Sequence, residues 1–566
     1  MNEFGKTGVI AGAAVVLTAL AMWMGPKEVR LEEFNDVGQE FFKGFDNGDA
    51  VAELEVSEFR EATSDVYQFN CKRDDKGRWT IPSHGNYPAD AKDRMGKAAA
   101  MLIGLKKDAF VADSKARHVD CGVVDPLEPG VDTAGRGKRI TMKDTAGNVL
   151  ADLIVGKEVE GKPGVHYVRV PDKKRTYRTK LEGELSTKFA DWIETDLLKA
   201  QSWDIAKVTF DNYTVDEQKG EVVPGEKIVV AKDAAGKWTV EGLDTTKQDP
   251  NEEKLNEIGT TLSSIKIVGV RGKPEGLTAR LERANGIETQ ILAQSLAAKG
   301  FFLARGGKLF SNEGDLLFET KKGVRYTLRF GELVIGEGDE LTSGAEPKPG
   351  KAPKDGEKKE GDKEPAKTGN HRYLMVTAEF DESLLQKPAG TRLPKDQIEK
   401  RATARKAIEE IQRAVEAFRA KNENKLPETL AKLTEKPAEG DALLKELKKD
   451  PWDNDYVLQP QGDSYVVISY ADDKKEGGEG VSTDVRSDRL PHEDEIKKTA
   501  DEWTSYDSKV EEGRKEGEKL TKRFGPWYYV IDQTLFGKLK PKRAELVKDK
   551  PPPSTPPAAA GGEPNK

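Results

Sequence analysis

The feature that most constrains the fold of this 566-residue chain is an internal repeat. The segment RDDKGRWTIPS, which contains Trp79, matches KDAAGKWTVEG, which contains Trp238. In each copy a hairpin-like run ends in Gly-Arg/Lys-Trp-Thr, and an amphipathic stretch follows it, at residues 91–105 and 253–265. Strand-rich sequence comes after both stretches. The repeat predicts two related modules of mixed α+β structure in tandem.

The predicted fold class is therefore α+β, and composition divides the rest of the chain into further regions. Residues 337–369 nearly lack apolar side chains, so burial there does not offset the entropy of ordering. A strand at residues 372–381 has its matching aromatic strand only at residues 525–532, so we expect a separate domain between them. The predicted regions are an anchor at 1–30, modules at 31–200 and 201–336, a disordered linker at 337–369, closing strands and a helix at 370–399 and 494–548, an inserted domain at 400–493, and a disordered tail at 549–566.

The amino terminus contains an uncharged apolar run, TGVIAGAAVVLTALAMWMG, from Thr7 to Gly25. About 19 residues at about 1.5 Å each span about 28 Å, close to the hydrocarbon core of a bilayer. Trp23 suits the interface, Pro26 ends the helix, and Lys6 favours a cytoplasmic amino terminus. We expect a single-pass anchor in the cytoplasmic (inner) membrane with the bulk of the chain extracytoplasmic. A cleaved signal peptide is the alternative, but the run is long for one and lacks a small-x-small cleavage site.

The charge pattern disfavours nucleic acid as a partner. The formal net charge is −8, and basic residues are interspersed with acidic ones instead of forming a basic stripe. The five histidines lie far apart in the sequence, and none has a second His or Cys at metal-ligand spacing. No zinc site is therefore predicted. Cys71 and Cys121 form either one disulfide in an exported chain or two small buried apolar residues.

The repeat region resembles the family catalogued as domain of unknown function 4340. The paired Gly-x-Trp-Thr strands, VHYVRVPDKKRTYRT, and RFGPWYYVIDQTLFGKLKPKRAELV carry the resemblance, which covers about residues 50–395 and 520–548. The resemblance implies a membrane-anchored protein that accompanies gliding-motility-type ABC transporters. It brings no catalytic residue with it.

The region at residues 400–493 has a more specific order of motifs. A helix from Ala402 places Ile408, Ile411, Val415 and Phe418 on one apolar face. The sequences DPWDNDY, SYVVISYADD and KKEGGEGVSTDV follow in that order. This order resembles the major pseudopilin (protein G) of type II secretion systems, in which a glycine-rich loop that closes on Asp binds calcium.

The resemblance assigns calcium ligands to Asp473, Asp484 and the backbone carbonyl of Tyr470. A hard divalent cation takes about six or more oxygen ligands, and the glycines at 477, 478 and 480 let backbone carbonyls turn inward. A solvated polar loop is the alternative interpretation for such a glycine-rich stretch. The sequence departs from the family pattern at three positions, which are Asp472, Lys474, where the family has Gly, and Asp453, where it also has Gly.

One family feature is missing, which excludes pilus assembly. Pseudopilins begin with a prepilin peptidase site and an apolar helix, whereas GTRLPKDQIEKRATARK precedes the helix here and is charged throughout. The domain therefore lacks the apolar packing surface on which pilus assembly depends. We expect it to be inserted between two strands of another domain.

Catalytic motifs are also missing from the sequence, and the chain is predicted not to be an enzyme. No Walker loop, Rossmann Gly-x-Gly-x-x-Gly, Gly-x-Ser-x-Gly or His-Glu-x-x-His motif occurs. The Ser-x-x-Lys match at Ser263 and Lys266 lies in a strand-like apolar run without partner motifs, and a chain of this length contains such matches by chance.

These inferences favour an anchored extracytoplasmic scaffold that binds other membrane or envelope proteins, such as an ABC-type transporter assembly. The alternative is a ligand-binding accessory subunit of an ABC-type transporter, in which the two modules form a cleft for a small molecule or glycan. Neither function follows from the resembled folds alone.

Overall fold

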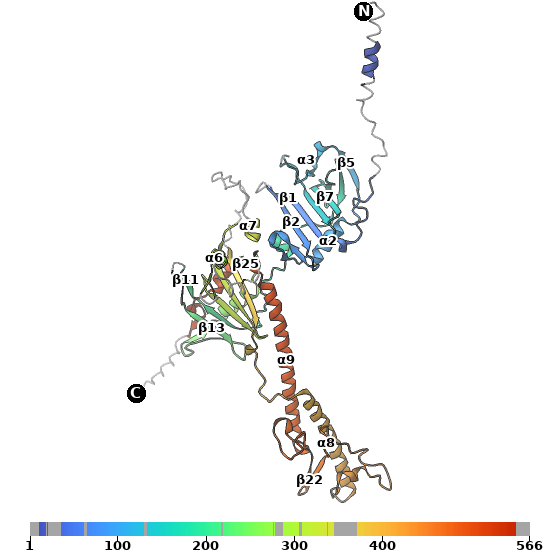
Figure 1. The fold of residues 1–566 in the computed structure, drawn as a ribbon, viewed down its shortest axis with the longest axis vertical. Coiled ribbons are helices and arrows are strands. Elements are labelled where there is room, and N and C mark those ends of the chain that lie inside the picture. The colour runs from blue at the N-terminus through green and yellow to red at the C-terminus, as the bar shows by residue number, and fades with distance from the viewer. Residues whose placement is uncertain are drawn as a thin grey trace, which may run out of the picture.

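The computed structural model describes residues 11–18, 20, 36–60, 65–129, 133–216, 219–274, 277, 287–304, 308–336, 338–344 and 371–550. The architecture of this part of the chain is mixed α+β, with two large antiparallel sheets and a smaller three-stranded one (Figure 1). The predicted α+β class is confirmed.

The first module is built on a sheet of nine strands among the described residues. In chain order these are β1 (Glu53–Arg60), β2 (Asp65–Arg73), β3 (Trp79–Ile81), β4 (Tyr87–Pro88), β5 (Ala109–Asp113), β6 (Lys138–Lys143), β7 (Val149–Glu158), β8 (Val165–Arg169) and β9 (Arg175–Lys180). Their order across the sheet is β4-β3-β2-β1-β6-β7-β8-β9-β5. Helix α2 (Lys92–Leu102) packs its buried face on this sheet and leads into β5.

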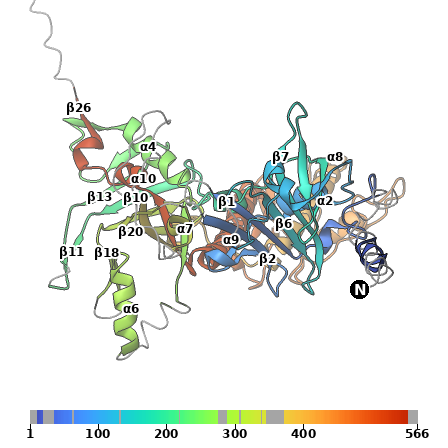
Figure 2. The same ribbon diagram turned by 90° about the horizontal axis from the view of Figure 1, so that it is seen from above.

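The second module contains a sheet of eight strands among the described residues. They are β10 (Ile205–Asp211), β13 (Lys227–Lys232), β14 (Trp238–Val240), β16 (Gly269–Gly272), β19 (Asp315–Thr320), β20 (Val324–Val334), β21 (His371–Phe380) and β25 (Trp527–Asp532). Their order is β14-β13-β10-β19-β20-β21-β25-β16, and helix α4 (Glu252–Ser263) leads toward β16 as α2 leads toward β5. Apart from β4, the first sheet has the same strand order and the same chain connections. Figure 2 shows the two sheets beside one another.

The repeated tryptophans occupy equivalent places in the two sheets. Trp79 on β3 lies opposite Arg73 on β2, and Trp238 on β14 lies opposite Lys232 on β13. In both hairpins the cation lies over the tryptophan ring, at 4.7 Å for Arg73 and 4.8 Å for Lys232. Cation–π contacts of this length stabilise the pairing of two short strands. The shared sequence motif therefore specifies a shared local structure.

A single hydrophobic core extends through both modules. At the junction, Tyr87 of the first module packs edge-on against Trp527 of the second, with ring centroids 4.9 Å apart. Beside them, His84 stacks on Phe189 at 4.0 Å, and its Nε2 lies 3.0 Å from the hydroxyl of Thr342. The modules therefore share apolar surface instead of being joined only by a linker.

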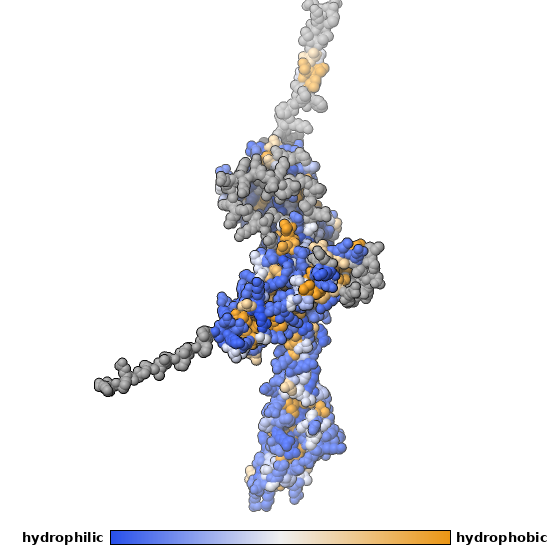
Figure 3. All heavy atoms as spheres, turned by 90° about the vertical axis from the view of Figure 1, so that its left-hand side faces the viewer, coloured by the Kyte–Doolittle hydropathy of each residue, from blue (hydrophilic) through white to orange (hydrophobic). Residues whose placement is uncertain are grey.

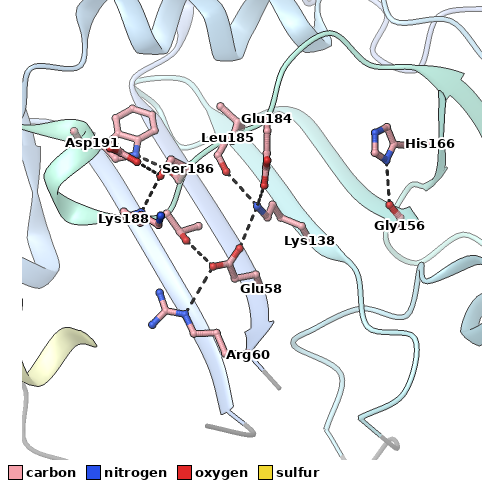
Figure 4. A network of polar contacts seen from close by, with 12 residues as sticks. Glu58, Arg60, Lys138, Gly156, His166, Glu184, Leu185, Ser186, Lys188 and Asp191 are labelled. Carbon is pink, nitrogen blue, oxygen red and sulfur yellow. Dashed lines mark hydrogen bonds and ion pairs between the residues drawn. The ribbon is translucent and has the colours of Figure 1, made fainter. Parts of the chain in front are cut away.

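The connector that follows β9 stays on the first sheet before the chain enters the second. Lys138 lies 3.1 Å from Glu58 and donates to Glu184 and to the carbonyl of Leu185 at 3.2 Å (Figure 4). Trp192 is almost fully buried and donates to the carbonyl of Ser186 at 2.8 Å. These contacts hold the connector in place beside the junction.

The chain between β21 and β25 forms the inserted domain and a long helix. Its elements are α8 (Lys395–Lys421), β22 (Val457–Gln461), β23 (Ser464–Ser469), β24 (Val485–Arg486) and α9 (Leu490–Phe524). Ile408, Ile411 and Val415 of α8 are buried in a separate core with Trp452, as their spacing predicts. Figure 1 shows this domain at the far end of α9 from the second sheet.

Helix α9 joins the insert to the second module by close packing. Gly513 and Gly517 face Phe380 of β21, so closely that a Cβ on Gly517 would lie 2.9 Å from the Phe380 nitrogen. Farther along, Leu520 and Phe524 enter the core that the two modules share. The carboxyl-terminal part of α9 therefore belongs structurally to the second module.

Several sequence expectations differ from the structure or lie outside the described residues. The disordered linker was predicted to begin at residue 337, but the next residues form helix α7 (Gly338–Ser343). This helix is ordered because Leu341 buries its side chain against Val334 and Val530. Outside the described part lie residues 345–370, the tail from residue 551, and residues 1–10, 19 and 21–30 of the expected anchor. Of the expected anchor, the described residues 11–18 and 20 are helical. Within the described part of the chain, no helix combines the length and apolarity needed to span a bilayer.

Candidate functional site

The scaffold of the candidate site is the Asp-Pro-Trp turn that precedes β22. Asp450 is buried, and its carboxylate accepts hydrogen bonds from the backbone of Trp452 at 3.0 Å and of Asn454 at 2.8 Å. It also accepts one from the hydroxyl of Ser469 on β23 at 2.6 Å. Because these bonds occupy both carboxylate oxygens, Asp450 supports the fold and is not a free metal ligand. The sequence predicts the motif but not this role of Asp450, because its partner Ser469 lies 19 residues away along the chain.

The loop between β23 and β24 has the backbone conformation that its glycines allow. Gly477, Gly478 and Gly480 have φ values of 108°, 84° and 62°. At Gly478 a Cβ would lie 2.2 Å from the carbonyl oxygen of Ser482, so a side chain has no room there. Lys474, which replaces a family glycine, has a φ of 60° and is exposed. The loop therefore keeps its tight turns despite that substitution.

Asp484 is the centre of the candidate metal site. It is 6% exposed, its Oδ2 accepts from the backbone N–H of Gly477 at 2.9 Å, and its own N–H donates to the Gly477 carbonyl at 3.2 Å. Its Oδ1 is buried without a hydrogen-bond partner among the described residues. A buried carboxylate oxygen without a donor is costly unless a cation fills its coordination.

The charges around Asp484 reinforce this interpretation. Burial raises the pKa of its carboxyl, and the negative charges of Asp473 and Glu476 raise it further, against the opposing hydrogen bond from Gly477 and charge of Arg486. Asp473 is half-buried and accepts from the backbone N–H of Lys475 at 3.1 Å. Carboxylates that repel one another in this way gain stability from a shared divalent cation.

The predicted ligand set fits calcium only if backbone oxygens contribute. In the part of the chain that the structure describes, no three His, Cys, Asp or Glu side chains gather as a metal site. The predicted set has two carboxylates, Asp473 and Asp484, and the carbonyl of the half-buried Tyr470, which immediately follows β23. The unpartnered Asp484 oxygen and the left-handed glycine conformations of the loop fit a hard cation that takes mostly oxygen ligands. When bound, calcium would cross-link the two limbs of the loop.

The Ser-x-x-Lys match does not form a nucleophile–base pair. Ser263 lies at the end of helix α4, not in a strand as its apolar surroundings predicted, and its hydroxyl donates to the Thr260 carbonyl at 2.8 Å. The Lys266 ammonium pairs with Asp196 instead. Both side chains therefore have structural partners of their own.

The two cysteines are free thiols, and both are buried. Burial raises the pKa of Cys71 to about 12, which keeps its thiol protonated and unreactive at neutral pH. The sequence left open whether Cys71 and Cys121 form a disulfide or are two small buried apolar residues. The structure shows the second arrangement.

These features define a class of protein in which two sheets of the same topology carry a pseudopilin-like domain with a glycine-rich loop. Comparisons with protein families find a match in each of the two parts. Residues 79–282 match the family described as Domain of unknown function (DUF4340), and residues 393–488 match Type II secretion system (T2SS), protein G. Both predicted resemblances are confirmed, and the DUF4340 match runs from β3 of the first sheet past β16 of the second. No curated protein matches the chain.

Proposed function

We propose that this protein is a membrane-anchored, extracytoplasmic and non-enzymatic scaffold that presents a calcium-stabilised, pseudopilin-like domain to other envelope proteins. The observation that carries the proposal is the position of that domain. It interrupts the hairpin between β21 and β25, and α9 holds it away from both sheets (Figure 1). A domain so placed is accessible to partners while the modules serve as its base.

The membrane end of the scaffold is the first module. Asp36 accepts hydrogen bonds from the hydroxyl of Tyr177 at 2.5 Å and from the ammonium of Lys107 at 3.1 Å. Ten residues lie between Gly25, the end of the proposed anchor, and Asp36, so an extended chain over this distance reaches at most about 40 Å. The first module would therefore lie close to the bilayer, and an ABC-type transporter in the same membrane is within reach as a partner.

The surface of the insert suits an individually presented domain better than a pilus subunit. On the face shown in Figure 3, the lower part of the molecule, formed by the insert and α9, is mostly hydrophilic. The apolar side chains of α8 pack inside the domain itself, against Leu433 and Val467 among others. Residues 390–406, which include the first turns of α8, are charged throughout, so hydrophobic assembly into a filament is disfavoured.

The alternative of a ligand-binding accessory subunit receives less support. That hypothesis placed a ligand cleft between the modules, but Tyr87, Phe189 and Trp527 pack together at their junction. A hollow of about 370 Å³ lies at the edge of the first sheet instead, and both basic and acidic side chains line it. We therefore favour the scaffold.

Calorimetry of the full-length protein in detergent tests the calcium loop. We expect calcium to raise the unfolding temperature of the insert relative to chelator, because the cation binds only the folded loop. Asp484→Asn and Asp473→Asn should abolish the shift, whereas the exposed neighbour Asp472→Asn should retain it. Identical unfolding curves in calcium and in chelator would refute calcium binding.

Gentle purification from membranes tests the scaffold role. We expect envelope proteins to co-purify with the full-length chain and to be lost when the insert is removed. Recovery of the isolated chain alone, both with calcium and with chelator, would contradict the role in an assembly.

A further inference from the structure

The candidate calcium loop is tied to the long helix by one buried guanidinium. Arg401 of α8 is 2% exposed, and its Nη1 donates to the carbonyl of Thr483 in the loop at 2.6 Å. Its Nε and Nη2 donate to the two carboxylate oxygens of Glu493 at 2.9 and 2.5 Å. Glu493 lies in the first turn of α9 and is itself buried. A single side chain therefore connects three segments: α8, the loop and α9.

This connection acts directly on the residue that the loop offers to a cation. Thr483 immediately precedes Asp484, so the bond from Arg401 fixes the peptide plane between them. Gly477 holds Asp484 at both its N–H and its Oδ2. The other carboxylate oxygen of Asp484, Oδ1, has no hydrogen-bond partner among the described residues. Arg401 is thus a positioning residue for the proposed ligand.

Glu493 is needed for electrostatic reasons. A bidentate Arg–carboxylate pair is strong, but removing one partner leaves an uncompensated buried charge. Without Glu493, the positive charge of Arg401 would remain near Asp484 and repel a divalent cation. The first turn of α9 therefore supplies the negative charge that makes Arg401 compatible with a calcium site.

The carboxyl-terminal end of α9 packs on the two modules, so this helix connects the insert to them. Leu520 and Phe524 are buried in the core shared by the two modules, and Gly517 packs on Phe380. The contacts between the first turns of α9 and the insert therefore determine how the insert is oriented relative to the modules. Any cation that orders the loop will order this junction if the Arg401 contacts persist.

We propose that Arg401 and Glu493 make the first turns of α9 part of the calcium site, so that calcium in the loop fixes the orientation of the insert on its helix. The inference rests on the proposed calcium loop and extends it from local stability to regulation of how the domain is presented. Because binding couplings are reciprocal, a partner that fixes α9 would also tighten calcium binding.

Hydrogen exchange of the full-length protein in detergent, in calcium and in chelator, tests the coupling. We expect calcium to slow amide exchange in the loop at residues 477–484 and also in α9 at residues 490–500, the latter by about tenfold, within the usual range of coupling between sites. Slower exchange in the loop without a change in α9 would overturn the coupling and leave the calcium loop intact. No change in either segment would refute the calcium loop itself and the inference with it.

Matched variants identify the connecting residues. In Glu493→Gln we expect saturating calcium still to protect the loop, while the response of α9 disappears. The control is Asp494→Asn, which breaks the neighbouring and more exposed pair with Arg405 and should leave the response of α9 intact. Arg401→Lys serves if Glu493→Gln does not fold, since lysine keeps the charge but cannot reach both partners with a planar fork. An equal α9 response in Glu493→Gln or Arg401→Lys and in Asp494→Asn would overturn the assignment.

Discussion

The two modules share a strand order but differ greatly at one equivalent turn. Residues 170–174 join β8 to β9 in the first module, whereas residues 381–526 join β21 to β25 in the second. Both strand pairs are antiparallel neighbours. The difference teaches that a hairpin turn accepts a whole domain when the two ends of the insertion lie close together. Here they do, because Trp503 of α9 donates to the carbonyl of Gly390 at 3.0 Å.

A smaller difference concerns the repeated hairpins. Lys232 over Trp238 donates to the carbonyl of Ser202 at 3.2 Å, so its charge has a hydrogen-bond partner. The equivalent Arg73 over Trp79 keeps its Nε buried without a partner among the described residues. The two modules have therefore kept the strand pairing and changed what surrounds it.

Two deletions distinguish the contribution of the insert from that of the packed end of α9. The first of them should have the largest effect of all the changes that we predict. Replacing residues 381–526 by the turn at residues 170–174 removes Leu520 and Phe524 from the core. The free energy of unfolding should fall by more than about 5 kcal/mol, which is enough to unfold the second module. Joining Gly390 directly to Trp503 removes the insert but keeps the packed end of α9, so the second module should stay folded. Thermal unfolding followed by circular dichroism distinguishes the two. Equal unfolding by both deletions would show that the insert itself supports the module.

The sequence predicted the parts of this comparison that depend on local pattern. The repeated Gly-x-Trp-Thr motif marked Trp79 and Trp238 as equivalent, and the apolar spacing on α8 marked the core of the insert. Both signals are short-range, because a strand pair or one helix face determines them. Asp484 was identified only through the family resemblance, since nothing in its neighbours reveals that it is buried.

The sequence did not predict contacts that depend on distant partners. Gly513 and Gly517 are ordinary helix glycines until Phe380 lies against them. The ion pair of Arg401 and Glu493 joins residues that neither spacing nor composition relates. Such contacts follow from the tertiary arrangement, and single-sequence patterns carry no information about them.

Acid should destabilise the junction between the modules. His84 of the first module is 2% exposed, and burial, followed by the positive charge of Arg271, lowers its pKa to about 4 from an ordinary value of 6.5. The unfolded chain therefore binds a proton at higher pH than the folded chain does. The contribution of neutral, buried His84 to the free energy of unfolding is therefore fully present above about pH 6.5. It falls by about 3 kcal/mol as the pH decreases toward 4.

Thermal unfolding as a function of pH measures this loss. In His84→Phe the stacking on Phe189 can persist without a titrating ring, so we expect a shallower decline between pH 6.5 and 4. Thr342→Val is the control, because it removes the hydrogen-bond partner from the second module but keeps the buried imidazole. An unchanged decline in His84→Phe would show that other groups cause the acid sensitivity. A single transition in the wild type would further indicate that the modules unfold together.

The smallest changes in stability that we predict come from replacing one helical glycine in each module by alanine. Gly517 of α9 lies against the backbone of Phe380, so Gly517→Ala should force the helix away from β21 and cost about 1–3 kcal/mol. Gly96 of α2 is exposed, with open space where a Cβ would lie, so Gly96→Ala should stabilise the first module by about 0.5–1 kcal/mol. Denaturant unfolding measures both changes. Opposite signs would confirm that close approach to β21, and not helix propensity, requires the glycine in α9. Stabilisation by both substitutions would mean that α9 is only loosely seated, and the insert would then lack a fixed base.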